Sequence, residues 1–128
     1  MNLKVVEKLQ LGRLATPLPD RRRPVYNWLP MKESFCRDLV GLLAETWRLE
    51  DDLVLDPFCG VGTTPLACKE LGINCVGYDV HPVMLFASRV KLRDYDVTGL
   101  RESIDELLGS KLERRDVDVP GFVARVFP

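Results

Sequence analysis

The sequence of 128 residues has little that would place it in a membrane or around a metal ion. Its apolar runs are far shorter than the roughly 18 residues of a membrane span, and its N-terminus lacks the basic-then-apolar pattern of a secretion signal. The four cysteines show no Cys-x-x-Cys spacing, and the single histidine, His81, cannot complete a usual zinc set. We therefore expect a cytoplasmic protein with no membrane or metal partner, whose cysteines are buried thiols.

The sequence also has few features that indicate binding of phosphate or of nucleic acid. No Gly-Lys-Ser/Thr tripeptide occurs, which argues against a phosphate-binding P-loop. The formal net charge of −1 gives no overall attraction to nucleic acid, so DNA contact would need a local patch or a partner chain. One candidate patch is the basic run at residues 21–23 (Arg-Arg-Arg), at the end of a proline-punctuated segment, residues 16–24, that predicts an extended linker.

The chain is organised around residues 53–65, which predict a strand, a tight loop and a helix start. Residues 53–55 (Leu-Val-Leu) form a short apolar run without alternation, typical of a strand buried on both faces. Gly60 and Gly62 allow a sharp turn and leave no side chain between the loop amides and a ligand. Either threonine of residues 63–64 could cap the helix, with Pro65 at its first position. A small molecule could therefore lie against this loop.

A second apolar strand is predicted after the helix, over residues 74–78, and it finishes at Asp79. The helix should end at Gly72 and face the sheet with Leu66, Ala67 and Leu71. Nucleotide-binding α/β folds place a carboxylate that grips a ribose diol about 20 residues beyond the glycine loop, which is the position of Asp79. A dinucleotide fingerprint would have Gly or Ala where Pro65 stands. We therefore expect a ligand with an adenosine-like ribose and no pyrophosphate.

Residues 56–64 (Asp-Pro-Phe-Cys-Gly-Val-Gly-Thr-Thr) resemble the S-adenosylmethionine-binding motif of amino-methylating DNA methyltransferases, which modify the exocyclic amine of cytosine or adenine. Val61 stands where that family usually has Ser. Residues 26–35 (Tyr-Asn-Trp-Leu-Pro-Met-Lys-Glu-Ser-Phe) are similar to the segment that precedes the motif and helps hold the methionine end of the cofactor. Residues 77–82 resemble the family's second-strand terminus, and the whole resemblance covers about residues 25–108.

The resemblance implies part of a Rossmann-like class I methyltransferase fold (α/β, in three α/β/α layers), the N-terminal, cofactor-binding portion of a restriction-modification enzyme. The chain would divide into an N-terminal helix and linker (1–24), the S-adenosylmethionine-binding domain (25–110) and a C-terminal tail (111–128). A core role is an equal alternative for Phe35, and a solvated charge is the alternative for Lys32. The implied cofactor-binding residues are Lys32, Phe35, Asp56, Pro57, Phe58, Gly60, Gly62, Thr63, Thr64 and Asp79.

The second motif of the family is missing from this chain. That motif is an Asp, Asn or Ser followed by Pro-Pro and an aromatic residue, whose oxygens accept hydrogen bonds from the target amine while the ring stacks on the flipped base. None of the nine prolines adjoins another, so no catalytic residue is assigned. We expect a second polypeptide to carry this motif and much of the DNA contact. The alternatives are an RNA or small-molecule methyltransferase with a variant motif, and a noncatalytic cofactor-binding remnant.

Periodic apolar residues predict further helices along the chain. One runs over 34–48, capped by Ser34, with Phe35 and Trp47 among the residues that pack on the sheet. Another follows the turn at residues 81–82 and continues to about residue 91. Shorter helices are predicted over 2–11 and over 100–108, the latter with Thr98 as a candidate cap, and the last ten residues predict a strand or a docking tail.

Overall fold

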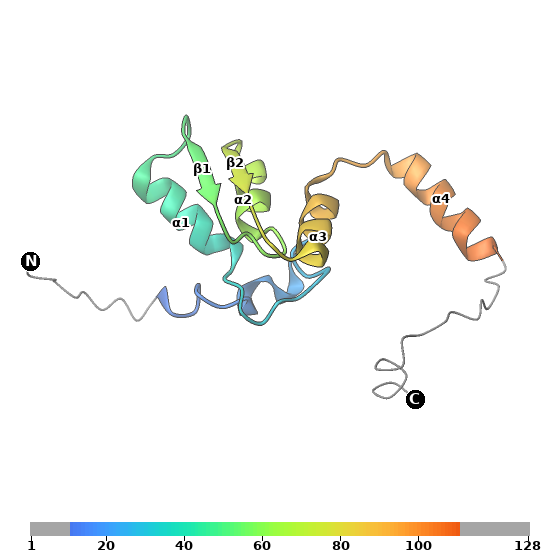
Figure 1. Cartoon of the computed structure of the whole chain (residues 1–128), viewed down its shortest axis with the longest axis horizontal. Coiled ribbons are helices and arrows are strands. Elements are labelled where there is room, and N and C mark those ends of the chain that lie inside the picture. The colour runs from blue at the N-terminus through green and yellow to red at the C-terminus, as the bar shows by residue number, and fades with distance from the viewer. Residues whose placement is uncertain (1–10, 111–128) are drawn as a thin grey trace, which may run out of the picture. The chain divides into compact units, whose positions relative to one another are not determined.

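A computed structural model describes residues 11–110 (Figure 1). Of these, residues 11–93 belong to one compact unit and residues 94–110 to another. The helix predicted over 2–11 and the segments predicted after residue 110 lie outside the described residues. In chain order the elements are the 3-10 helix η2 (Leu18–Arg22), α1 (Arg37–Trp47), β1 (Leu53–Asp56), α2 (Thr63–Leu71), β2 (Asn74–Gly77), α3 (Pro82–Leu92) and α4 (Val97–Gly109).

The two strands form a parallel pair connected by α2, which makes the β-α-β unit of a Rossmann-like α/β fold (Figure 1). Leu53 lies opposite Asn74 in the register, and Asp56 lies opposite Gly77. As predicted, α2 ends at Gly72, which has a left-handed φ of 72°. The predicted strand, loop, helix and strand are therefore confirmed. Within residues 11–110, no helix is long and apolar enough to cross a membrane.

The hydrophobic core lies on one face of the two strands. It is formed by buried residues of α1 (Val40 and Ala44), α2 (Ala67 and Cys68) and Ile73, with Val54 and Cys75 of the strands packed against them. Consecutive strand residues point to opposite faces, and α1 and α2 cover only the face of Val54. Leu53 and Leu55 are consequently 66% and 61% exposed. The prediction that this strand is buried on both faces is wrong for the part of the chain that the structure describes.

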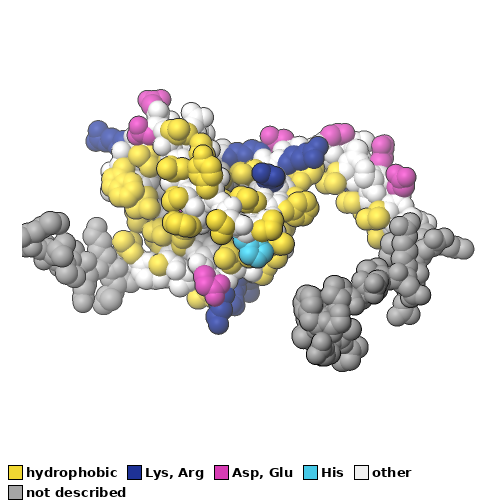
Figure 2. Space-filling view, viewed as in Figure 1, with side chains coloured by type: hydrophobic (Ala, Val, Ile, Leu, Met, Phe, Trp, Pro, Cys, Tyr) yellow, Lys and Arg dark blue, Asp and Glu magenta, His cyan; other side chains and the backbone are white. Residues whose placement is uncertain are grey.

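The opposite face, which we call the bare sheet face, consists of Leu53, Leu55, Asn74, Val76 and Tyr78. The register pairs Leu55 with Val76, so both side chains lie on the same side of the sheet. Tyr78 continues the alternation just after β2 and is 61% exposed. Figure 2 shows hydrophobic side chains gathered over the two strands and α3 on this side. The described residues thus supply two of the three layers that the resemblance implies.

Helix α1 begins at Arg37, three residues later than predicted, and its N-cap is Cys36. The hydroxyl of Ser34 does not cap it, because that hydroxyl bonds to the carbonyl of Phe35 and to the hydroxyl of Thr63. Trp47, predicted to pack on the sheet, is 63% exposed. The periodicity predicted where the helix lies in the chain. It did not predict that the helix begins at Arg37 or that Trp47 is exposed.

Helix α2 also begins differently from the prediction. Its N-cap is Gly62, with no side-chain cap, and the two threonines are its first two residues. Pro65 is therefore third rather than first, still within the turn whose N–H groups have no helical partner. Leu66 and Ala67 are buried as predicted, whereas Leu71 is exposed.

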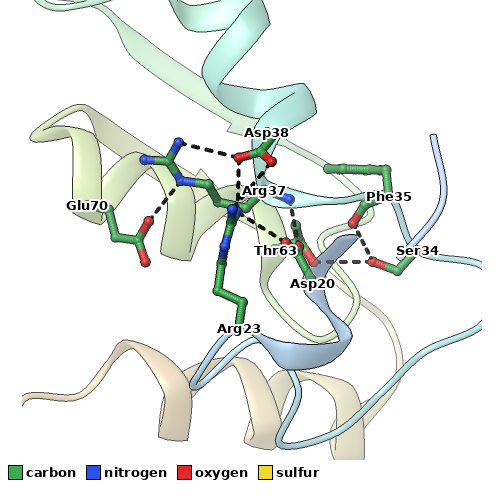
Figure 3. A network of polar contacts seen from close by, with 8 residues as sticks. All are labelled: Asp20, Arg23, Ser34, Phe35, Arg37, Asp38, Thr63 and Glu70. Carbon is green, nitrogen blue, oxygen red and sulfur yellow. Dashed lines mark hydrogen bonds and ion pairs between the residues drawn. The ribbon is translucent and has the colours of Figure 1, made fainter. Parts of the chain in front are cut away.

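The segment predicted as an extended linker contains η2 and is fastened to α1 (Figure 3). Asp20 is buried, and its Oδ2 accepts the backbone N–H of Arg37 at 2.7 Å, at the start of α1. Arg23 forms a two-pronged ion pair with Asp38, with Nη1–Oδ1 at 3.0 Å and Nη2–Oδ2 at 3.3 Å. The guanidinium of Arg23 also lies 5.9 Å from the ring centroid of Tyr26. Arg23 is therefore a structural residue, whereas Arg21 and Arg22 are exposed.

The last two helices follow the predicted periodicity more closely. Helix α3 begins directly after His81, with Pro82 at its first position, and confirms the helix predicted there. Helix α4 begins three residues earlier than predicted, because the carboxylate of Asp96 accepts the N–H groups of Thr98 and Gly99 and caps it. Thr98 is thus bound by the cap and is not itself the cap.

Candidate cofactor site

Two carboxylates meet the glycine loop where the parallel strands end. Asp56 is the last residue of β1, and its Oδ1 accepts the backbone N–H of Phe58 at 3.0 Å. Asp79 follows β2, and its Oδ2 accepts the N–H of Gly60 at 2.8 Å. Its Oδ1 accepts the N–H of His81, also at 2.8 Å. Asp56, Gly60 and Asp79, which the sequence assigned to one site, therefore lie together.

The hydrogen bonds to Asp79 keep it ionised. Donation by the N–H of His81, followed by that of Gly60, lowers the pKa of the Asp79 carboxyl below its ordinary value. An ionised carboxylate has about four lone-pair positions, and these two amides use two of them. Asp79 therefore braces the loop and retains acceptor positions for a ligand hydroxyl. The bracing role was not foreseen from the sequence, since it depends on how the loop folds back on β2.

The two loop glycines have different surroundings. Both have left-handed backbones, with φ of 51° at Gly60 and 85° at Gly62. A Cβ added to Gly60 would lie 3.4 Å from the Sδ of Met31, which is an ordinary contact with a flexible side chain. A Cβ added to Gly62 would lie 2.9 Å from the Cβ of Ser88 and even nearer its hydroxyl. Gly62 is thus required for packing against α3, a reason that the sequence did not show beside the sharp turn and the approach of a ligand.

A cavity of about 430 Å³ lies beside the loop, between the N-terminal segment at 16–21, the segment at 26–35, Val61 and Thr63. Lys32, Phe35 and Thr63, all predicted cofactor residues, line it. Phe35 also packs against the hydrophobic core, so its two alternative roles are compatible. The hydroxyls of Ser34 and Thr63 share a hydrogen bond of 3.2 Å, which ties this segment to the start of α2 (Figure 3).

The remaining predicted residues do not line this cavity. Pro57 and Phe58 are exposed at the loop surface, and Thr64 is buried. Three of the predicted residues therefore line the cavity, whereas Gly60 is hydrogen-bonded to the Asp79 carboxylate outside it. Met31 connects these groups, because it lines the cavity and lies beside Gly60.

Sequence reasoning missed the part that the N-terminal segment plays at the cavity. Asp20 lines it, together with Arg21 of the basic run and Tyr26 of the segment that the resemblance had singled out. No periodicity or motif marks Asp20, because its partner is the backbone of a helix that begins 17 residues later. Val61 was noted only for standing where the family has Ser, and it too lines the cavity.

The cysteine of the loop is a protonated, structural thiol. Burial, followed by the negative charges of Asp56 and Asp79, raises the pKa of Cys59. Burial likewise raises the pKa of Cys75 to about 12. Cys36, Cys59 and Cys68 are buried and Cys75 is partly buried, all as free thiols. In the described part of the chain, no cluster of His, Cys, Asp and Glu side chains could hold a metal ion.

Part of this chain is similar in sequence to a known protein family. Residues 31–87 match the sequence model of the DNA methylase family N6_N4_Mtase. Over this stretch the chain matches that DNA methylase family. The matched stretch contains β1, the glycine loop, α2, β2 and Asp79, and it also reaches back to Lys32 and Phe35.

Curated relatives agree with this assignment. The type II methyltransferase M.MjaII of Methanocaldococcus jannaschii is 33% identical over 94 residues, which are 73% of this chain and 18% of that protein. M.BsoBI of Geobacillus stearothermophilus, also a type II methyltransferase, is 34% identical over 80% of this chain and 21% of its own length. The chain therefore spans about a fifth of these relatives. The crystal structure of the M1.HpyAVI–SAM complex is 33% identical over 50% of this chain and 32% of its own, with a TM-score of 0.44.

Proposed function

We propose that this chain is the cofactor-binding part of a site-specific DNA methyltransferase, which transfers a methyl group from S-adenosylmethionine to an exocyclic amine of cytosine or adenine. The observation that carries the proposal is the Asp79 carboxylate beside the amide of Gly60, at the carboxyl ends of two parallel strands. The description of the matching family, DNA methylase, favours DNA over RNA or a small molecule as the substrate.

The residues around the loop fit such a cofactor. Asp79 would accept hydrogen bonds from the ribose hydroxyls, using the acceptor positions that the two amides leave. The absence of a P-loop suits a nucleoside without a pyrophosphate. Lys32, Phe35 and Thr63 line the neighbouring cavity and would hold the methionine end. When bound, S-adenosylmethionine supplies an electrophilic methyl group on a positively charged sulfur.

The methyl acceptor would be positioned by a second polypeptide. No two prolines adjoin in this chain, so the Pro-Pro-aromatic motif that the family resemblance implies must come from elsewhere. The relatives are about five times as long as the part that this chain matches, which leaves ample sequence for such a motif. DNA would be contacted mainly through that partner, because the net charge of this chain is only −1.

Two measurements test the proposal in turn. Titration calorimetry should show that the purified chain binds S-adenosylmethionine or its demethylated product. Transfer of a radiolabelled methyl group to DNA should require, besides this chain, the polypeptide that is encoded beside it and carries the Pro-Pro-aromatic motif. Absence of cofactor binding would contradict the assignment of the site. Turnover by the chain alone would contradict the need for a partner, and binding without turnover in any combination would favour a noncatalytic remnant.

A further inference from the structure

A buried lysine lies behind the residues that line the cavity. Lys91, in the last turn of α3, is only 6% exposed. Its Nζ donates a hydrogen bond of 3.4 Å to the carbonyl of Tyr26, which lies 65 residues earlier in the chain. Lysine is almost never buried unless its ammonium group has a partner, because removing a charge from water is costly. The burial of Lys91 is therefore explained by its polar contact with the N-terminal segment and not by hydrophobic packing.

The partner of Lys91 belongs to a segment that forms one side of the cavity. Residues 16–32, which we call the cavity wall, supply most of the residues that line the cavity. The regular element within this stretch is η2, so the position of the wall depends on contacts with other parts of the chain. Asp20 and Arg23 fasten the wall to α1. Lys91 adds a contact from α3.

The negative charge of Asp20 also acts on the Lys91 ammonium. Burial lowers the pKa of Lys91, and the charge of Asp20 opposes this decrease. Asp20 is itself buried and lines the cavity. Lys91 is thus attracted to the wall at two places, the carbonyl of Tyr26 and the carboxylate of Asp20.

Tyr26 is the residue through which Lys91 would influence the cofactor. Its side chain is 7% exposed and lies against the guanidinium of Arg23, so both its ring and its carbonyl are held. The stretch that follows Tyr26 contains Lys32 and Phe35, which line the cavity. A shift of the backbone at Tyr26 would therefore move the residues that we assign to the methionine end of the cofactor. Tyr26 and Lys91 both lie outside residues 31–87, which match the family.

We propose that Lys91 is a positioning residue for cofactor binding, which holds the cavity wall at Tyr26 and thereby sets the place of the residues around the methionine end of S-adenosylmethionine. This inference rests on the proposed function. Lys91 acts through Tyr26 and does not touch the cofactor. A wall that is fixed before the ligand arrives does not have to be ordered when the ligand binds, which favours affinity. Loss of Lys91 should therefore weaken ligands that reach the wall and spare ligands that do not.

The positioning role is tested with Lys91→Met, which keeps most of the side-chain length and removes the charge. Lys69→Met is the matched control, because the Nζ of Lys69 also donates to a backbone carbonyl, that of Leu92 at 2.6 Å, but this contact joins α2 to α3. Calorimetry measures the affinity for two ligands. One is the demethylated product, S-adenosylhomocysteine, and the other is 5′-methylthioadenosine, which lacks the amino-acid end.

We expect Lys91→Met to weaken S-adenosylhomocysteine at least about tenfold and 5′-methylthioadenosine less than about twofold. Lys69→Met should change neither affinity by more than about twofold. Lys91→Arg keeps a charged donor and should recover most of the lost affinity for S-adenosylhomocysteine. A general loss of structure would weaken both ligands alike, so the difference between them reports the wall.

Trp28 reports the position of the wall without any ligand. It lies two residues after Tyr26 and is 56% exposed. The chain has two tryptophans, so Trp47→Phe leaves Trp28 as the only one. In that background, Lys91→Met should make Trp28 more accessible to quenching by acrylamide, whereas Lys69→Met should leave the quenching unchanged.

Circular dichroism shows whether each variant is folded. If Lys91→Met unfolds the chain, Lys91→Gln, which is neutral but polar, takes its place in every measurement. Unfolding by both substitutions would overturn the proposal, because Lys91 would then maintain the fold as a whole. Equal weakening of the two ligands by a folded variant would also overturn it, and so would unchanged affinity for both.

The tryptophan measurement separates this inference from the proposed function. Greater quenching of Trp28 in Lys91→Met, in a chain that binds neither ligand, would support the role of Lys91 at the wall while contradicting the cofactor site. Normal binding of both ligands by the wild type, with Trp28 and both affinities unchanged in Lys91→Met, would give the opposite result.

Discussion

The two faces of the same short strands differ sharply. Val54 and Cys75 pack against buried residues of α1 and α2, whereas Leu53 and Leu55 point away from α1 and α2 and are largely exposed. Each face carries apolar residues, so the presence of an apolar residue does not show which face is covered. The difference shows that the strand sequence encodes burial on both sides, while the described residues provide cover for one side.

The largest effect should come from placing a charge on each face in turn. Val54→Asp buries an unpaired carboxylate against the core and should lower the free energy of unfolding by about 3 to 5 kcal/mol. Leu55→Asp on the bare sheet face should change it by less than about 0.5 kcal/mol in the isolated chain. Urea denaturation measures both. Equal destabilisation by the two substitutions would mean that the bare sheet face is covered in the free chain.

A second pair of variants extends the comparison to the glycines. Gly62→Ala meets both a left-handed backbone and the side chain of Ser88, and should cost about 2 to 4 kcal/mol of unfolding free energy. Gly72→Ala meets a similar φ with no atom within 4 Å, so it should cost only the backbone strain of about 1 to 2 kcal/mol. Urea denaturation of both variants isolates the packing against α3. Equal costs would mean that the side chain of Ser88 moves aside without loss of stability. Gly62 would then be needed only for the approach of a ligand.

Removal of the carboxylate at the cofactor site should act on ligand affinity more than on the fold. Asp79→Ala should weaken S-adenosylmethionine binding about tenfold to a hundredfold, because a charge-assisted hydrogen bond contributes roughly 1.5 to 3 kcal/mol. Calorimetry measures the change, with Asp51→Ala, an exposed residue ahead of β1, as the control.

Because Asp79 also holds the amide of Gly60, its two roles need to be separated. An analogue of the demethylated product that lacks the ribose 2′-hydroxyl should bind the wild type more weakly than the parent compound does. Asp79→Ala should bind both compounds equally. If the mutant still distinguishes the two compounds, Asp79 acts only through the loop.

The smallest effect concerns the ion pair that fastens the N-terminal segment. The hydrogen bond from Arg23 lowers the pKa of the Asp38 carboxyl below its usual 3.8. Because the folded-state pKa is lowered, the stabilisation is present above pH 3.8 and is lost as the pH falls through the folded-state value. Both side chains are partly exposed, so Arg23→Gln should cost only about 0.5 to 1 kcal/mol at pH 7.

The matched control for this pair is Arg22→Gln, since Arg22 is exposed on the neighbouring position. Urea denaturation at pH 7 and below pH 3 should show the deficit of Arg23→Gln shrinking at the lower pH. In an Asp38→Asn background, Arg23→Gln should show a smaller deficit, which reflects its remaining contacts with Asp20 and Tyr26. A deficit that is independent of pH would assign the role of Arg23 to its packing over Tyr26.

Predictions from the sequence succeeded where the signal is local. Gly72 ends α2 because a residue without Cβ adopts the left-handed conformation easily, and Pro82 begins α3 because its fixed φ suits the first turn. Asp79 was located by its distance from the glycine loop, and it does meet that loop at Gly60. Each of these inferences needed only neighbouring residues or a spacing that the β-α-β unit imposes.

Predictions failed where a distant partner decides the outcome. Ser34 does not cap α1, because its hydroxyl bonds to Thr63 across the fold, and the start of α1 is held by Asp20 instead. Residues 18–22 form a helix fastened to α1, although their prolines indicated a linker. A hydroxyl or carboxylate satisfies whichever donor or acceptor the fold brings near, and spacing along the chain does not show which one that is.

By itself, the sequence determined the order of strand, glycine loop, helix and strand, together with the motif that assigns the chain to its family, because these depend on short-range geometry and on residue type. Only the tertiary structure decided which face of the strands is covered, that Gly62 makes room for Ser88, and that Asp79 braces Gly60. An apolar residue in a strand is more stable when it is buried, but its identity does not specify which chain segment will cover it. That segment is selected by packing between elements far apart in sequence.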